Sequence, residues 1–191
     1  ILPITETIDY KIIYNSIDFT VNEVEASNLE IETRKNSLIF EKMANQISIN
    51  DIREINTNYQ KPAILYITGG SSGSNPSLQE LKNWKRKKGF EVYEVSTSTI
   101  GSSNVSDIKN YIQQAYNEFD PAPEYICLIG DDGGEFNIDS YTEFYSGYNG
   151  EGDHPFSQLD GNDILPDVLL GRISIRTFDH LNTIIQKILF Y

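Results

Sequence analysis

Four short stretches of the chain are rich in apolar, strand-forming residues, and segments with helical spacing lie between and after them. Apolar runs that lack polar alternation are typical of strands buried on both faces, as in a parallel sheet. The runs are residues 63–67, 90–95, 125–129 and 168–175. Strands that alternate with helices over short connections favour right-handed crossovers within one sheet. The sequence therefore predicts an α/β fold with a mostly parallel sheet and helices on both faces.

The first helix of this region has predictable ends. Residues 77–88 carry apolar side chains at helical spacing, with basic residues toward the C-terminal end. Ser77 is the expected N-cap, because Glu80 follows three residues later as in a capping box. Gly89 is the expected stop, since glycine readily adopts the left-handed conformation that ends many helices.

Two further helices and one long loop follow. A helix is expected to open at Ser106 or Asp107 and to end near residue 119. Another is expected after Thr177 as its N-cap, with apolar residues at helical spacing. Between them, residues 132–158 are rich in Gly, Tyr and acidic side chains, and we expect a long loop there.

The beginning of the chain has a different pattern. Apolar and polar residues alternate in residues 17–21 and 29–33, which predicts strands with one solvent-exposed face. Residues 37–49 follow with the spacing of a short helix, and the polar stretch 50–61 has the composition of a linker. We therefore expect a β-rich segment with its linker over residues 1–60 and the α/β domain over residues 61–191.

The composition limits the classes of partner. The 191 residues are 39% hydrophobic and carry a formal net charge of −13, with a pI near 4.5. Such an acidic surface repels nucleic acid and anionic membranes and suits cations. No stretch is long and apolar enough to span a membrane, and no signal peptide is visible. The chain begins at Ile1 and stops inside a helical pattern, so we expect a piece of a longer protein.

Two candidate sites receive little support from the residues themselves. The loop of residues 68–76, TGGSSGSNP, lies between a strand and a helix, where glycine-rich turns can hold phosphate. It lacks the lysine of a P-loop and the spacing of a dinucleotide fingerprint, so a flexible connection is favoured. The single cysteine, Cys127, could pair with His154 or His180, but it lies mid-strand among apolar neighbours, where thiols are usually inert.

Acidic residues near two strand ends form a third candidate. Asp131 directly follows one buried strand, and a loop before the next carries Asp160, Asp163 and Asp167. Ligands collect beyond the carboxyl ends of strands in open α/β sheets. Hard divalent cations take several carboxylate and carbonyl oxygens at about 2.3–2.6 Å, and this loop could supply both. From spacing alone, a metal site and ordinary turn hydrogen bonds are both open.

Several sequence words, taken together, resemble the first half of the catalytic domain of the gingipain family of cysteine peptidases. The resemblance runs from about residue 59 to residue 191, in matching order and spacing. The words are LKNWKRKKGFEV, STIGSSNVSDIKNYIQQAY, PEYICLIGD, GNDILPDVLLGRIS and LNTIIQKILFY. Residues 1–60 match weakly and could be the tail of a prodomain.

This resemblance implies a fold and the location of the catalytic residues. The family's catalytic domain has two side-by-side α/β subdomains of the caspase type, also described as Rossmann-like. Its catalytic His and Cys belong to the second subdomain, downstream of the position that matches Tyr191. No catalytic residue therefore carries over to this chain, and Cys127 does not match the nucleophile. The implied partners are the downstream catalytic subdomain and, through it, protein or peptide substrates. The family is secreted or surface-attached in bacteria.

The resemblance also implies a structural calcium ion. The aspartate that closes the strand word in the family binds Ca²⁺, and it corresponds to Asp131. The loop word supplies two more carboxylates, which correspond to Asp163 and Asp167. Main-chain oxygens at the positions of Asp160 and Leu165 complete the implied set. Asp160 and the neighbouring Pro166 depart from the family pattern, and neither removes an oxygen.

Two functions from different classes follow. The chain is either the non-catalytic subdomain of a secreted gingipain-like endopeptidase with a structural calcium, or a non-enzymatic α/β binding or scaffold module, such as a degenerate peptidase relative. An H-G word followed by a cysteine in the next part of the parent sequence would separate them. A weaker third interpretation is a nucleotide-binding domain that uses residues 68–76.

Overall fold

The computed structural model describes residues 11–14, 17–20, 37–47, 59–145 and 147–190. By internal contacts the chain divides into two compact units, Ile1–Glu32 and Thr33–Tyr191. The first contains an antiparallel strand pair, β1 (Lys11–Tyr14) and β2 (Ile17–Thr20). The strand expected at residues 29–33 and most of the expected linker lie outside the described residues. The boundary near residue 60 stays a prediction.

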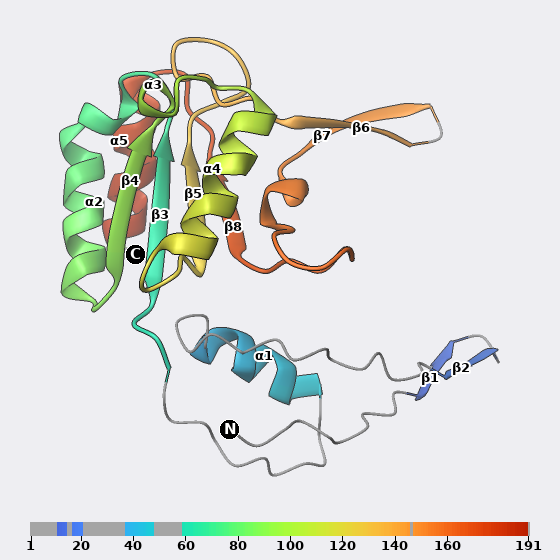
Figure 1. The fold of residues 1–191 in the computed structure, drawn as a ribbon. Coiled ribbons are helices and arrows are strands. Elements are labelled where there is room, and N and C mark those ends of the chain that lie inside the picture. Colours follow the sequence, from blue (N-terminus) through green and yellow to red (C-terminus); the bar gives the residue numbers. More distant parts are fainter. Residues whose placement is uncertain (1–10, 15–16, 21–36, 48–58, 146, 191) are drawn as a thin grey trace. The chain divides into compact units, whose positions relative to one another are not determined.

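The second unit begins with a helix, α1 (Leu38–Ile47), where the sequence predicts one. Its sheet has four strands: β3 (Ala63–Thr68), β4 (Glu91–Ser96), β5 (Tyr125–Ile129) and β8 (Leu169–Ile173). They are ordered β4-β3-β5-β8, and all three pairings are parallel (Figure 1). Each of the four predicted strands is present within two residues of its expected ends, and the predicted parallel α/β fold is confirmed.

The helices are α2 (Pro76–Lys87), α3 (Thr97–Ile100), α4 (Val105–Glu118) and α5 (Phe178–Phe190). The predicted N-cap of the first is wrong, because Asn75 and not Ser77 caps α2. The Asn75 side chain accepts hydrogen bonds from the amides of Ser77 and Leu78, at 2.9 and 3.3 Å, with Pro76 as the first helical residue. Asn75 also donates to the side chain of Asn182 on α5, at 3.0 Å, so its position has a tertiary reason.

The next helix also starts earlier than expected. Asn104 caps α4 by accepting a hydrogen bond from the Asp107 amide at 2.9 Å, so neither Ser106 nor Asp107 is the cap. The expected cap of α5 is confirmed, since the Thr177 hydroxyl accepts from the His180 amide at 3.2 Å. None of the helices in the described ranges has the length and apolar character that crossing a bilayer requires.

Residues 132–158 are more ordered than the predicted loop. They contain an antiparallel hairpin, β6 (Tyr141–Tyr145) and β7 (Tyr148–Gly152), and a short 3₁₀ helix, η3 (His154–Ser157). Figure 1 shows the hairpin extending away from the sheet, and Phe144 on it is 80% exposed. A two-stranded hairpin buries little apolar surface, so its sequence lacks the clear alternation by which strands are recognised.

Two apolar clusters cover the two faces of the sheet. On one face, Leu65 and Leu128 pack against α4 together with Phe156 of η3. On the other face, Tyr66 and Ile129 pack against α2 and α5. Helices therefore lie on both faces, as parallel sheets require.

Asp131 lies beyond the carboxyl end of β5, whereas the loop with Asp160, Asp163 and Asp167 precedes β8 and lies at the amino ends of the strands. The structure therefore places the predicted metal ligands at opposite ends of the sheet.

Candidate functional site

Asp131 lies just beyond β5 and uses both carboxylate oxygens within the chain. Oδ1 accepts a hydrogen bond from the Ser174 hydroxyl at 2.8 Å, and Oδ2 accepts from Nε of Arg176 at 2.6 Å. The bond from Arg176, and then that from Ser174, lowers the pKa of Asp131 below its usual value. The Arg176 side chain is 72% exposed, so this ion pair is open to water. Asp131 is thus an anion paired with an exposed cationic side chain.

The loop before β8 is organised by its own carboxylates. Asp167 accepts hydrogen bonds from the amides of Leu159 and Asp160, at 2.6 and 2.9 Å. Asp163 accepts from the amide of Leu165 at 2.8 Å, as in a side-chain-stabilised turn. Asp160 accepts from the next amide along the chain, at 2.9 Å. These bonds hold the loop in shape, and they are the turn chemistry that the sequence left open.

The donor chemistry of the predicted metal site fits calcium, but the carboxylates are not assembled in the described residues. Asp131 binds Arg176 and Ser174, while Asp163 and Asp167 bind amides of their own loop. Within the described ranges, no group of three His, Cys, Asp or Glu side chains is placed to hold a metal ion. The set Asp131, Asp160, Asp163, Leu165 and Asp167 therefore stays a prediction.

The glycine-rich loop after β3 is closed by the loop that follows β5. A Cβ atom on Gly69 would lie 2.3 Å from the carbonyl oxygen of Phe136, and one on Gly70 would lie 2.2 Å from that of Glu135. The amide of Gly69 donates to Ile129 at 2.9 Å, and that of Gly70 to the Thr97 hydroxyl at 3.2 Å. Carbonyl oxygens against the turn and amides already bonded leave a poor setting for phosphate. The nucleotide interpretation receives no support from this geometry.

Arg172 connects the elements around the carboxyl end of β5, and sequence analysis did not single it out. Its guanidinium forms a two-pronged ion pair with Asp153, with both N–O distances 2.7 Å. It also donates to the carbonyl oxygens of Gly130 and Ile138, at 3.3 and 2.8 Å. Its side chain is only 13% exposed. A lone arginine within an apolar strand was the available signal, because such a residue needs partners when buried.

Cys127 is not positioned as a nucleophile. It lies mid-strand in β5 on the face that carries α2 and α5. Burial raises the pKa of its thiol to about 12, only partly offset by the positive charge of Lys85. His154 begins η3, whose Phe156 packs on the opposite face of the sheet, and its Nε2 donates to the Ile164 carbonyl at 2.9 Å. His180 is exposed in the first turn of α5.

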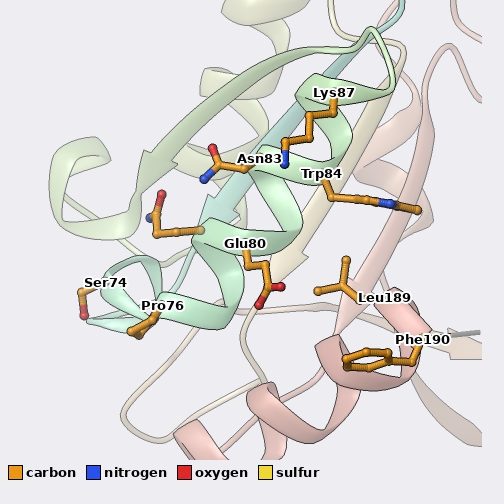
Figure 2. Close-up of a pocket in the computed structure, with 9 residues that line it drawn as sticks. Ser74, Pro76, Glu80, Asn83, Trp84, Lys87, Leu189 and Phe190 are labelled. Carbon is orange, nitrogen blue, oxygen red and sulfur yellow. The ribbon is translucent and has the colours of Figure 1, made fainter.

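A hollow of about 690 Å³ lies between α2 and the end of α5. Figure 2 shows Glu80 and Trp84 of α2 facing Leu189 and Phe190 of α5 across it, with the Lys87 side chain beside Asn83. It includes neither Cys127 nor any residue of the predicted metal site. Its mixed lining has no cluster of nucleophilic or metal-binding groups, so it adds nothing to the chemistry of the site.

Comparisons with known proteins place the sequence in a family. The family model of peptidase family C25 matches residues 57–191. No curated protein sequence matches the chain. A solved structure described as a protease is 25% identical, with a TM-score of 0.57, over 68% of this chain and 28% of that one.

Two gingipain structures show the same fold. The Arg-specific cysteine proteinase gingipain R is 20% identical with a TM-score of 0.56, over 69% of this chain and 28% of that one. The complex of the pro- and mature domains of RgpB from Porphyromonas gingivalis gives 21% identity and a TM-score of 0.57, over 68% and 29%. This chain spans less than a third of each matched structure. The family match nevertheless covers most of its residues, and the chain therefore belongs to peptidase family C25, the gingipain family of cysteine peptidases.

Proposed function

We propose that this chain is the non-catalytic α/β subdomain of a secreted gingipain-type cysteine endopeptidase, whose catalytic His and Cys are supplied by polypeptide outside these residues. The observation that carries the proposal is the state of Cys127, the one cysteine of the chain. A cysteine peptidase attacks its substrate with a thiolate, which an adjacent imidazole generates or stabilises. A thiol with a pKa of about 12 is protonated at neutral pH, and neither histidine forms a hydrogen bond with it in the described residues.

This proposal predicts that Cys127 is dispensable for peptide hydrolysis. The Cys127→Ala variant of the complete protein should retain its kcat/KM within about twofold, because the thiol contacts only core residues. Hydrolysis of fluorogenic peptides measures this, and alkylation with iodoacetamide should inactivate the wild type and the variant alike. If the variant folds but its kcat/KM falls by several orders of magnitude, the nucleophile lies in this chain and the proposal is contradicted.

The alternative is a non-enzymatic module that keeps the family fold without its chemistry. An isolated α/β domain with an exposed hairpin would also suit a scaffold. Under that hypothesis the complete protein lacks an alkylation-sensitive activity altogether. The peptidase interpretation is favoured because the family match spans residues 57–191, which include Asp131 and the loop before β8.

The proposed partners are other parts of the same protein. In the structure of the RgpB complex, the pro-domain and the mature domain are bound to each other. By analogy, residues 1–60 belong to a preceding prodomain tail, and the catalytic subdomain packs on the α/β unit. Substrate proteins or peptides would be bound by that second subdomain. Secretion and a surface location follow from the same family proposal.

We also propose that calcium stabilises the loop before β8 and joins it to the end of β5. Three carboxylates, Asp131, Asp163 and Asp167, and the carbonyls of Asp160 and Leu165 are the hard oxygen donors that Ca²⁺ prefers. Calcium binding requires Asp131 to release Arg176. Loss of that exposed ion pair costs little stability. The loop before β8 must also move, because it lies at the amino end of β8 while Asp131 lies beyond the carboxyl end of β5. The role would be structural, with no part in peptide cleavage.

Calcium is therefore expected to raise the melting temperature relative to EDTA. A ligand that binds only the folded state stabilises it by about 2.7 kcal/mol at a hundredfold excess over its Kd. The Asp131→Asn, Asp163→Asn double variant should lose the rise, whereas Arg176→Gln should reach it at lower calcium, because the competing cation is gone. Thermal melts across a calcium series measure all three. Identical melts with calcium and EDTA would show that the carboxylates only shape the loop.

A further inference from the structure

The edge strand β8 is covered on one face and, around Gly171, open on the other. On the face of α4, Val168 is buried and Leu170 packs with the cluster that contains Phe156. On the face of α2 and α5, β8 presents Leu169, Gly171 and Ile173, which are paired with Tyr125, Cys127 and Ile129 of β5, and Ile173 packs against the cluster on that face. Gly171 is exposed, and a Cβ atom on it would meet no atom within 4 Å. Parallel strands normally have both faces covered, so the first part of β8, around Gly171, lacks a layer on this side.

Helix α5 packs beside α2, and its other side borders the open face. Asn182 contacts Asn75 at the start of α2, and Leu181 and Ile185 form the buried stripe of α5. At helical spacing, Ile184 and Ile188 lie across that stripe from Asn182, on the side away from α2. Ile188 is 39% exposed. We define the open face as Leu169, Gly171 and Ile188, none of which carries a charge, while the neighbouring Cys127 and Ile184 pack against the cluster of α2 and α5.

We propose that an α-helix from the remainder of the peptidase polypeptide packs on this open face and crosses β8 at Gly171. The inference rests on the proposed function. A glycine inside a strand marks a place where another backbone approaches closely, and no side chain at this one fills the space. The existing layer on this face is helical, so a helix beside α5 continues it. The matched structures are more than three times as long as the matched region, which leaves ample chain to supply the helix.

Substitution of Gly171 tests the packing. In the 191-residue chain, Gly171→Leu should leave the melting temperature unchanged or raise it slightly. The site is open, and glycine destabilises the interior of a strand more than leucine does. In the complete protein, the same side chain would occupy the position of the docked helix and should lower the melting temperature by about 5 °C or more. Gly171→Ala should give a smaller decrease. Gly152→Leu, at the end of β7 and also surrounded by open space, is the matched control and should shift neither protein.

Each outcome decides the proposal. A decrease confined to Gly171 variants of the complete protein supports it. Equal melting of Gly171→Leu and wild type in the complete protein overturns it, because the face would then be open. An equal decrease in both proteins, or a decrease with Gly152→Leu as well, overturns it too. Peptide hydrolysis by the wild-type complete protein is measured separately: its absence would refute the proposed function, while the melting comparison would still decide whether the face is covered.

Discussion

Gly69→Ala is expected to lower the free energy of unfolding by about 3 kcal/mol or more, the upper end of the cost of overpacking. The added Cβ would lie 2.3 Å from the Phe136 carbonyl oxygen and 2.6 Å from its carbon. Both are backbone atoms, which cannot rotate away as the end of a side chain can. The loop after β5 would have to move off the turn after β3, and Phe136, which is fully buried, would move with it. Urea unfolding of the two proteins measures the difference.

Gly130 and Gly171 give this prediction its comparison. Gly130→Ala should be similarly destabilising, because its Cβ would lie 2.2 Å from the same oxygen of Phe136. Gly171→Ala in the 191-residue chain should change the stability by less than about 0.5 kcal/mol, as expected for an unobstructed surface site. If Gly69→Ala unfolded at the same urea concentration as Gly171→Ala, the two loops would not be in contact as described.

Arg172→Met is expected to cost about 3 kcal/mol of stability, near the range for breaking a largely buried ion pair. Methionine keeps much of the apolar stem but leaves Asp153, whose side chain is only 19% exposed, without its partner. The carbonyl oxygens of Gly130 and Ile138 lose a donor in the same substitution. Arg172→Lys should recover only part of the loss, because a lysine ammonium cannot reproduce the two-pronged geometry. Chemical denaturation of the variants gives the values.

The control for Arg172 is an ion pair with a similar N–O distance whose two side chains are exposed to solvent. Lys61 and Glu91 lie 2.9 Å apart with side chains 52% and 39% exposed, and Lys61→Met should change stability by less than about 1 kcal/mol. Comparable losses of stability for Arg172→Met and Lys61→Met would mean that burial does not strengthen the contribution of the Arg172 ion pair to stability. In that case Arg172 would not be the residue that joins η3 to the carboxyl ends of β5 and β8.

Local sequence was a sound guide wherever one element decides its own structure. The apolar runs 63–67 and 125–129 lie within β3 and β5, because a strand buried on both faces must be apolar throughout. The end of α2 was equally clear, since Gly89 has a φ of +93°, which glycine adopts without strain. The family words around residues 57–191 led to the same fold as the matched structures.

Only the tertiary structure decided which of several equivalent residues is used. Asn75 and Ser77 are both good helix caps. The helix is capped by Asn75, whose side chain also donates a hydrogen bond to Asn182, 107 residues away. The hairpin within residues 132–158 pairs two strands that carry no clear apolar alternation, so its pairing could not be read from spacing.

The sequence by itself determined the alternation of strands and helices, the family and the acidic residues at the strand ends. It could not determine the partners of those residues, because a carboxylate serves a metal, an arginine or a backbone amide equally well. Folding placed Arg176 on Asp131 and loop amides on Asp167. It also left Gly171 open on one face of β8, a property of how helices are packed around a strand and not of the strand's own residues.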